Sequence, residues 1–217
     1  MKISTAEQGS AEWKKARAGV ITASMFHTAT QKLKVGTKKG EPTEAAHDYA
    51  FRLAIERISG EPIDEGFETW AMVRGRELEA EARSAHERHA GVVVDPCGFI
   101  CTNDGLFGAS ADGLIGDDGG AEYKCLVSPA RLRKALMLND THEFMYQVQG
   151  GMWITGRKWW DFCIYTPFLA SIGKELTWWR VKRDDGFIEK MELDLIEFSK
   201  LVDKYEYDLM FGELNRG

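Results

Sequence analysis

The chain has 217 residues, of which 44% are hydrophobic and 29% charged, and its formal net charge is −6. This composition is that of an ordinary globular protein long enough to bury a core, and it excludes a disordered or fibrous chain. The acidic balance argues against a protein that coats nucleic acid with a uniformly basic surface, although lysines gather locally between residues 32 and 39.

The first ninety residues predict mainly helices. Capping residues and apolar spacing favour short helices over 10–19 and 22–30. The segment 31–42, rich in lysine and glycine, predicts a mobile loop. Apolar residues at helical spacing then predict helices over 43–59 and 68–90.

Beyond residue 91 the chain predicts strands that alternate with helices. The predicted strands are 92–94, 98–101, 106–110, 122–126, 159–165 and 176–182. The predicted helices are 128–137, 141–155 and a long amphipathic one over 185–211. This order favours an α/β (α+β) fold with a central mixed sheet flanked by helices. We expect one domain over 1–217, made of a helical part (1–90), a sheet core (91–183) and a C-terminal helix (184–212).

Two further absences bear on the class of protein. No apolar run is long enough to cross a bilayer and no signal peptide is evident, so we expect a cytoplasmic protein without a membrane partner. The four cysteines, at 97, 101, 125 and 163, lack the spacing of a zinc site and are interpreted as reduced thiols.

The segment from Asp112 to Lys124 carries the strongest chemical pattern. Side chains alternate along a strand, so Glu122 and Lys124 project to the same side and Tyr123 to the other. The sequence Asp-Asp-Gly-Gly at 117–120 predicts a turn that could bring Asp112 beside Glu122.

Such a trio has two interpretations. Two carboxylates can hold Mg²⁺, which lowers the pKa of a bound water and stabilises charge on a phosphate. A lysine beside them can orient the attacking water or neutralise charge in the transition state. The alternative is an acidic surface hairpin with a Glu122–Lys124 pair of little energetic weight.

Several stretches occur together in an order that matches a known family. They are 8–13 with 17–24, 75–83, 110–114, 122–125 and 147–165. In combination they resemble the phage lambda exonuclease and YqaJ-like viral recombinase family, within the restriction-endonuclease-like nucleases. The chain departs from the family at Ala111, where proline is usual, which removes a rigid φ angle but no ligand.

The resemblance implies roles for residues of the catalytic centre. Asp112 and Glu122 would bind the metal, and Lys124 would assist the attacking water. Glu79 would be a further carboxylate near the metal, and Gln147 would lie at the same centre. From the residues alone, the preferred interpretation of Glu79 is an ion pair with the arginine four positions later, and the default interpretation of Gln147 is the edge of a helix core.

A second group would hold the 5′-phosphate of the substrate. The resemblance implies this role for Arg17, Ser24 and Ser110, and places Lys34 where the family can have a second phosphate-binding arginine. Asp104 has an open interpretation, either another acidic residue of the metal site or the aspartate of a turn before glycine.

The resemblance also implies an activity. The expected enzyme is a Mg²⁺-dependent 5′→3′ exonuclease of the alkaline exonuclease type, with two metal ions and Mn²⁺ able to substitute. It would degrade one strand of linear double-stranded DNA and leave a 3′ single-stranded overhang for phage-type homologous recombination. The expected partners are double-stranded DNA ends, a single-strand annealing protein and further copies of the chain in a homotrimeric ring. The expected source is a phage or prophage in a bacterial host. The alternatives are a structure- or site-specific endonuclease of the same fold and a non-catalytic DNA-binding assembly protein.

Overall fold

The computed structural model describes residues 1–63 and 70–213, apart from the side chains of 71 and 72. The chain forms two compact units, each discontinuous in sequence. The first unit comprises Met1–Asp64, Gly98–Ser110 and Asp184–Gly217, and the second comprises Glu65–Cys97 and Ala111–Arg183. The single nuclease domain expected from the sequence stays a prediction.

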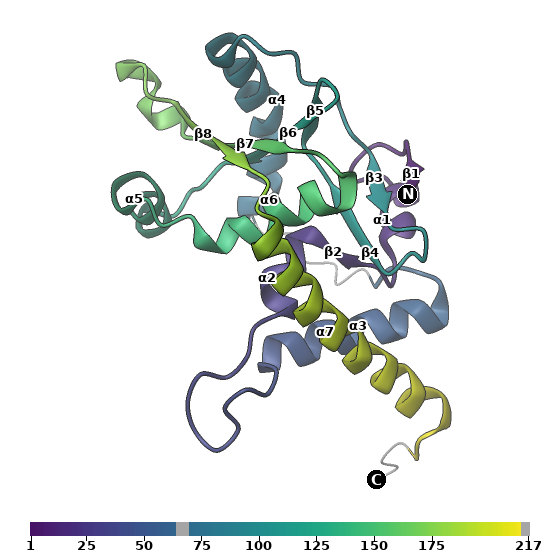
Figure 1. The fold of residues 1–217 in the computed structure, drawn as a ribbon. Helices are drawn as coiled ribbons and strands as arrows, with labels where there is room; N and C mark the ends of the chain where they lie inside the picture. Colours follow the sequence, from purple (N-terminus) through teal and green to yellow (C-terminus); the bar gives the residue numbers. More distant parts are fainter. Residues whose placement is uncertain (64–69, 214–217) are drawn as a thin grey trace. The chain divides into compact units, whose positions relative to one another are not determined.

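The first unit contains a small mixed sheet of four strands (Figure 1). In spatial order the strands are β1 (Lys2–Ser4), β3 (Phe99–Cys101), β4 (Phe107–Ser110) and β2 (Ile21–Thr22). β3 pairs antiparallel with both β1 and β4, whereas β2 runs parallel to β4. The ends of β2 and β4 therefore meet at the same edge of the sheet.

Helices complete the first unit. They are α1 (Ala11–Arg17), a 3₁₀ turn (Ala23–Met25), α2 (Phe26–Ala29), α3 (Glu44–Ser59) and α7 (Asp185–Phe211). The hydroxyl of Thr43 caps the start of α3, and Gly60 ends it in the left-handed conformation. α7 packs across α3, where the rings of Tyr49 and Phe198 stack with centroids 5.5 Å apart. The helices predicted over 43–59 and 185–211 are confirmed.

The second unit is built on another mixed sheet of four strands. In spatial order these are β5 (Gly113–Ile115), β6 (Gly119–Lys124), β7 (Trp159–Tyr165) and β8 (Leu176–Lys182). β6 and β7 are parallel, and the two outer pairs are antiparallel. The helical segments of this unit are α4 (Trp70–Ala90), α5 (Pro129–Leu138), α6 (His142–Thr155) and a 3₁₀ helix (Pro167–Ile172).

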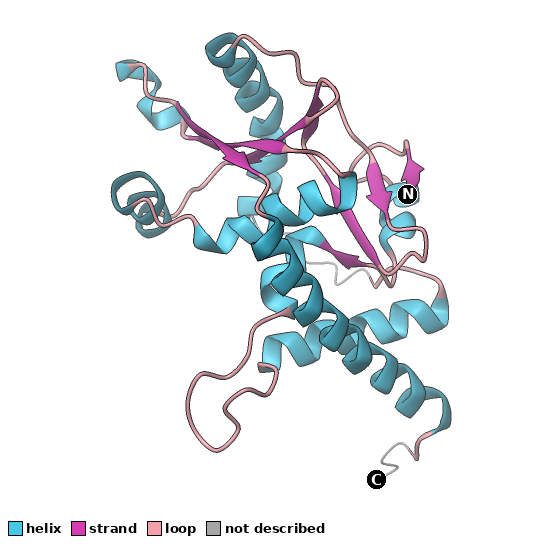
Figure 2. Ribbon diagram, in the orientation of Figure 1, coloured by secondary structure: helices cyan, strands magenta, loops and turns pink. Residues whose placement is uncertain are grey.

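Helices cover both faces of this second sheet (Figure 2). Alternate strand residues such as Tyr123 and Cys163 pack in one core with Ala82 of α4. Their neighbours on the other face, such as Phe162, pack in a second core with Val148 of α6. The period of two along a strand thus places consecutive residues of β6 in different surroundings.

The mixed α/β class is confirmed, with the strands divided between two sheets. The strand predicted over 92–94 is wrong, because only the next residue, Asp95, forms a bridge, to Leu114. The helix predicted over 22–30 begins instead with β2 and the 3₁₀ turn. The predicted helix start at residues 68 and 69 lies outside the described part. In the described part of the chain, no helix combines the length and apolarity needed to span a bilayer.

Candidate active site

The hairpin of β5 and β6 brings the two central carboxylates together. Gly113 pairs with Ala121 in antiparallel register, so the next position along places Asp112 opposite Glu122. The backbone N–H of Tyr123 donates to Oδ2 of Asp112 at 2.7 Å, which fixes the carboxylate against the strand. The proximity predicted from the turn at 117–120 is confirmed.

Glu122, Lys124 and Gln147 form a closed ring of hydrogen bonds. The Lys124 ammonium donates to Oε1 of Glu122 at 2.8 Å and to Oε1 of Gln147 at 2.9 Å. The amide nitrogen of Gln147 donates to the same Glu122 oxygen at 2.6 Å. Glu122 is 3% exposed, so these bonds supply the partners that a buried carboxylate requires. The structure therefore groups three of the predicted residues from β6 and α6.

The charges of the centre act strongly on one another. Burial, then the charges of Glu122 and Glu79, raise the pKa of Asp112 well above its ordinary value. Burial also raises the pKa of Glu122, against the opposing effect of Lys124. Burial disfavours the charged amine of Lys124, yet the nearby Glu122 and Asp112 carboxylates raise its pKa overall. The centre is thus a cluster of buried carboxyl groups beside one amine that stays protonated.

Glu79 of α4 forms the ion pair that its sequence position predicts, and its charge also acts on the carboxyl groups of the centre. Its Oε1 accepts a hydrogen bond of 2.8 Å from Arg83, the ion pair expected at that helical spacing. Its charge nevertheless contributes to the raised pKa values of Asp112 and Glu122. Glu79 is thus part of the electrostatic environment of the centre while being held by Arg83.

The donor set fits a hard divalent cation. Asp112 and Glu122 offer carboxylate oxygens, and a cation bound to them would offset the burial and the nearby carboxylate charges that raise their pKa values. Among the described residues, no three histidine, cysteine, aspartate or glutamate side chains form a ready metal-binding group. Mg²⁺ retains several waters when bound, so two protein carboxylates are a sufficient anchor for it.

Two side chains of the first unit donate hydrogen bonds to the hydroxyl of Ser110. The indole N–H of Trp13 donates to this oxygen at 3.1 Å, and Nη1 of Arg17 donates to it at 3.0 Å. A hydroxyl has two acceptor sites and one proton, so the Ser110 proton remains available to a further acceptor such as a phosphate oxygen. Burial lowers the pKa of Arg17 to about 10, which leaves the guanidinium charged at neutral pH.

Trp13 belongs with this group through two contacts. Besides its bond to Ser110, its ring lies 4.1 Å from the Arg17 guanidinium carbon, a cation–π contact. A tryptophan and an arginine four positions apart on one short helix are the only local signal for this pairing.

Ser24 lies at the same edge of the sheet as Ser110. Thr22 of β2 pairs in parallel with Gly108 of β4, and each serine follows its paired residue by two positions. Ser24 is exposed, with its hydroxyl 3.3 Å from that of Thr22. The parallel register thus explains why serines far apart in sequence end at one place.

Two other predicted residues are not brought into these groups. Lys34 lies in the exposed loop after α2, where backbone bonds join Leu33 and Glu41, and no described hydrogen bond links it to Arg17, Ser24 or Ser110. The Asp104 carboxylate accepts from the backbone N–H of residue 106 at 3.0 Å, as expected for a turn aspartate. The bond from that N–H lowers the pKa of Asp104.

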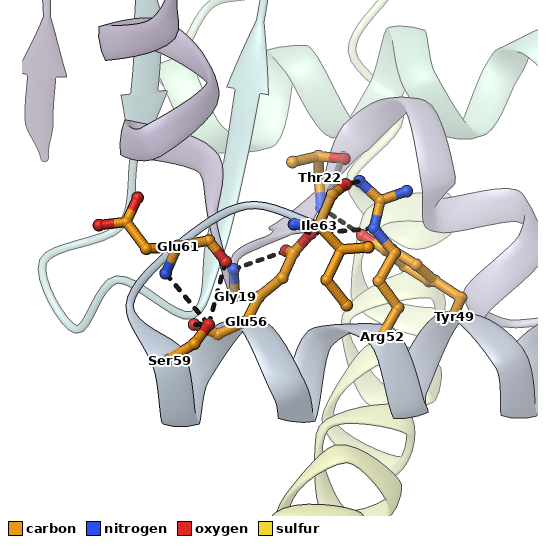
Figure 3. Close-up of polar contacts among 8 residues, drawn as sticks. All are labelled: Gly19, Thr22, Tyr49, Arg52, Glu56, Ser59, Glu61 and Ile63. Atoms are coloured by element: carbon orange, nitrogen blue, oxygen red, sulfur yellow. Dashed lines mark hydrogen bonds and ion pairs between the residues drawn. The ribbon is translucent and has the colours of Figure 1, made fainter. Parts of the chain in front are cut away.

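A buried glutamate, not foreseen from the sequence, fixes the segment that follows Arg17 (Figure 3). Glu56 of α3 is 4% exposed and accepts from the backbone N–H of Gly19 at 2.9 Å, from that of Ile63 at 3.1 Å and from Arg52 at 2.9 Å. Gly19 has φ of +72°, and a Cβ there would lie 2.6 Å from an atom of the Arg57 side chain. Glycine is required for this close approach.

Replacing Glu56 by alanine is expected to lower the free energy of unfolding of the first unit by about 3 kcal/mol. The substitution leaves two backbone N–H groups and Arg52 without their shared acceptor. Chemical denaturation measures the effect, with Glu61→Ala as control, because Glu61 is exposed and paired with Lys15 on the surface. Equal stability of the two variants would contradict the role given to Glu56.

Comparison with known proteins finds one matching family model and several similar structures. The model of the YqaJ-like viral recombinase domain matches residues 12–158. The crystal structure of LHK-Exo in complex with dAMP is similar with TM-score 0.78 and 31% identity, over 91% of this chain and 95% of that one. An alkaline exonuclease (LHK-Exo) from Laribacter hongkongensis is similar with TM-score 0.77 and 30% identity, over 93% and 97% of the two chains.

A more distant structure shares the fold. A phage-related exonuclease from Haemophilus somnus 129PT has TM-score 0.70 at 15% identity, over 88% of this chain and 96% of that one. No curated protein sequence matches this chain. The family match spans both the hairpin of Asp112 and Glu122 and the residues around Arg17, and the chain belongs to the YqaJ-like viral recombinase family.

Proposed function

We propose that this protein is a Mg²⁺-dependent 5′→3′ exonuclease that degrades one strand of linear double-stranded DNA and leaves a 3′ single-stranded overhang. The observation that carries the proposal is the ring of Glu122, Lys124 and Gln147 with Asp112 opposite Glu122. Similarity to an alkaline exonuclease at 30% identity supports a nuclease. The charged groups of the centre support hydrolysis of a phosphodiester.

The proposed mechanism gives each residue of the centre a task. Asp112 and Glu122 would hold the metal, two ions in the full site, with Glu79 as a further nearby carboxylate. When bound, Mg²⁺ supplies an acidified water and stabilises charge on the phosphate. Lys124 stays protonated, so it orients the attacking water and neutralises negative charge that develops on the phosphate.

Gln147 has a supporting task in this mechanism. Its amide oxygen accepts from Lys124 and its amide nitrogen donates to Glu122, so it fixes the direction of both side chains. The ring leaves one Glu122 oxygen, Oε2, outside these bonds and thus suited to a cation.

In the same proposal, the direction of digestion comes from the 5′-phosphate. Arg17 offers a planar guanidinium to phosphate oxygens, and Ser110 offers the proton left by its two donors. Ser24 adds a hydroxyl at the same edge, and Lys34 would add a charge from its loop. A strand that begins with a phosphate would therefore be held better than one that begins with a hydroxyl.

The proposal also includes a wider setting for the enzyme. The enzyme would act as a ring-shaped homotrimer in the bacterial cytoplasm, encoded by a phage or prophage, with Mn²⁺ able to replace Mg²⁺. A ring encloses the DNA, so only its inner wall needs basic residues. A chain with a net negative charge can therefore still hold DNA. A single-strand annealing protein would bind the exposed 3′ strand for recombination.

Replacing Arg17 by alanine is expected to lower kcat/KM on 5′-phosphorylated ends by about 10- to 100-fold, the value of a lost charge-assisted hydrogen bond. Activity on 5′-hydroxyl ends should change little. Rates on the two kinds of end measure this difference, and Lys15→Ala provides a control on the same helix, because Lys15 pairs with Glu61 at the surface. Equal losses of kcat/KM on both kinds of end would contradict the proposal that Arg17 binds the 5′-phosphate.

The shape of the DNA substrate distinguishes the proposal from its alternatives. The proposed exonuclease digests linear duplex in the presence of Mg²⁺ and leaves covalently closed circular duplex intact. Cleavage of the closed circle would indicate an endonuclease of the same fold. Binding of linear DNA without any cleavage would indicate a non-catalytic assembly protein.

A further inference from the structure

A chain of buried polar groups lies behind the strand that carries Glu122 and Lys124. Tyr123 points to the opposite face of the sheet, where its hydroxyl lies 3.1 Å from Nδ1 of His86 on α4. His86 is fully buried, and its Nε2 lies 3.2 Å from Oδ2 of Asp161 on β7. Four elements of the second unit contribute to this chain, since β8 supplies its last member.

Arg180 of β8 is the last member of this series of polar groups and the one most exposed to solvent. Its guanidinium donates two hydrogen bonds of 2.9 Å to the two oxygens of Asp161, and it stacks over Trp159 with its central carbon 3.8 Å from the ring centroid. Burial works against the charge of Asp161, but the bonds from Arg180 and His86 lower its pKa overall. A charged carboxylate is thereby kept in a fully buried position.

The carboxylate also determines the orientation of His86. An ionised aspartate only accepts, so the imidazole proton lies on Nε2, although the contact with Asp161 is off the line of a full hydrogen bond. In a neutral imidazole Nδ1 carries no proton, so it accepts from the hydroxyl of Tyr123, 3.1 Å away. With a neutral imidazole, the order of donors therefore runs from Tyr123 through His86 to Asp161.

This series of polar groups is connected to the candidate metal ligands through the backbone of β6 and through helix α4. Tyr123 lies between Glu122 and Lys124, and its own N–H holds Asp112 at 2.7 Å. His86 lies seven residues after Glu79, two turns along the same side of α4. A shift of either the tyrosine or the histidine would therefore move carboxylates of the centre relative to one another.

We propose that Tyr123 and His86 are positioning residues that set the spacing of the metal-binding carboxylates, with Asp161 and Arg180 fixing the histidine. This inference rests on the proposed function, because it assigns the chain to the metal site of that function. Groups that orient metal ligands from behind typically change metal affinity by 10- to 100-fold when lost. A purely structural hydrogen bond would instead change stability alone.

Tyr123→Phe tests the proposal with the loss of one oxygen atom. The backbone N–H that holds Asp112 and the packed ring both remain. We expect the Mg²⁺ concentration for half-maximal cleavage to rise about tenfold, and Mn²⁺ binding measured by electron paramagnetic resonance without DNA to weaken by a similar factor. The KM for DNA at saturating Mg²⁺ should stay at the wild-type value.

Tyr205→Phe is the matched control. It removes another tyrosine–histidine hydrogen bond, of 2.8 Å to Nδ1 of His47, between α7 and α3 of the first unit. This variant should lose a comparable amount of stability and keep the wild-type Mg²⁺ dependence and Mn²⁺ affinity. The pair of variants thus separates a general loss of stability from a change at the metal site.

The outcomes distinguish this inference from the function on which it rests. A wild-type protein that neither binds Mn²⁺ nor cleaves DNA would contradict the proposed function, and the inference with it. If the wild type binds Mn²⁺ and the Tyr123→Phe variant binds it with equal affinity, the positioning role is overturned while the proposed function stands. If that variant fails to fold, Arg180→Gln provides the same test, because the Arg180 side chain is 44% exposed. We expect a smaller rise in the Mg²⁺ concentration for half-maximal cleavage. An unchanged value would contradict the positioning role.

Discussion

Replacing Lys124 by alanine is expected to abolish DNA cleavage, with kcat reduced by about 10³-fold or more, while DNA binding survives. Lys124 is the only amine in the described ring with Glu122 and Gln147, and the carboxylates keep it protonated despite burial. Its loss removes the positive charge that offsets charge developing on the phosphate. It does not remove the residues proposed to hold the DNA end.

Two measurements check this expectation. Single-turnover cleavage of linear duplex gives the rate, and fluorescence anisotropy with the same duplex in Ca²⁺ gives the affinity. Lys158→Ala is the matched control, because Lys158 forms an exposed pair with Asp118 that resembles the Lys124 pair in chemistry but not in burial. A Lys124→Ala variant that cleaves at the wild-type rate would show that the proposed mechanism is wrong.

The second large effect is expected at Asp112. Asparagine there retains an acceptor for the backbone N–H of Tyr123 but loses the charge that a metal requires, so cleavage should fall by about 10³-fold. The same change should stabilise the metal-free protein at neutral pH. Burial and the charges of Glu122 and Glu79 raise the pKa of Asp112, which means that its ionised form is disfavoured in the folded state.

Single-turnover cleavage of linear duplex tests the loss of activity, and thermal unfolding with and without Mg²⁺ tests the gain in stability and the loss of metal binding. The metal-free variant should melt at a higher temperature than the metal-free wild type, and Mg²⁺ should stabilise only the wild type. Asp117→Asn is the control, since Asp117 is an exposed acid in the turn of the same hairpin. A variant that melts lower than wild type and still gains stability from Mg²⁺ would contradict the assignment of Asp112 as a ligand.

Local signals were enough to predict that a turn brings Asp112 beside Glu122. A turn sequence at 117–120 and the period of two along a strand determine which side chains meet, and both depend on neighbouring residues only. Long helices such as α3 and α7 were predictable for the same reason, because their apolar spacing and end caps are local. The short strands β1, β2 and β5 carry too few residues for a period to be visible.

The supporting polar groups were not predictable, because they depend on contacts between distant segments. Glu56 has an arginine four positions earlier, so its sequence indicates a surface ion pair, whereas its oxygens accept from Gly19, 37 residues away. His86 lies on a helix with many charged residues, yet it is fully buried against Tyr123 and Asp161. Nothing in the local sequence of either residue states which distant group it meets.

The most direct test of the proposed function is a strand-resolved digestion of linear duplex DNA. One strand carries a 5′-phosphate and the other a 5′-hydroxyl, each with its own label, and the reaction is run with Mg²⁺ and with a chelator. The proposal predicts that Mg²⁺ alone permits digestion, that the phosphorylated strand is degraded from its 5′ end, and that the other strand remains intact with a 3′ overhang. Digestion from the 3′ end, or equal digestion of both strands in the chelator, would contradict it.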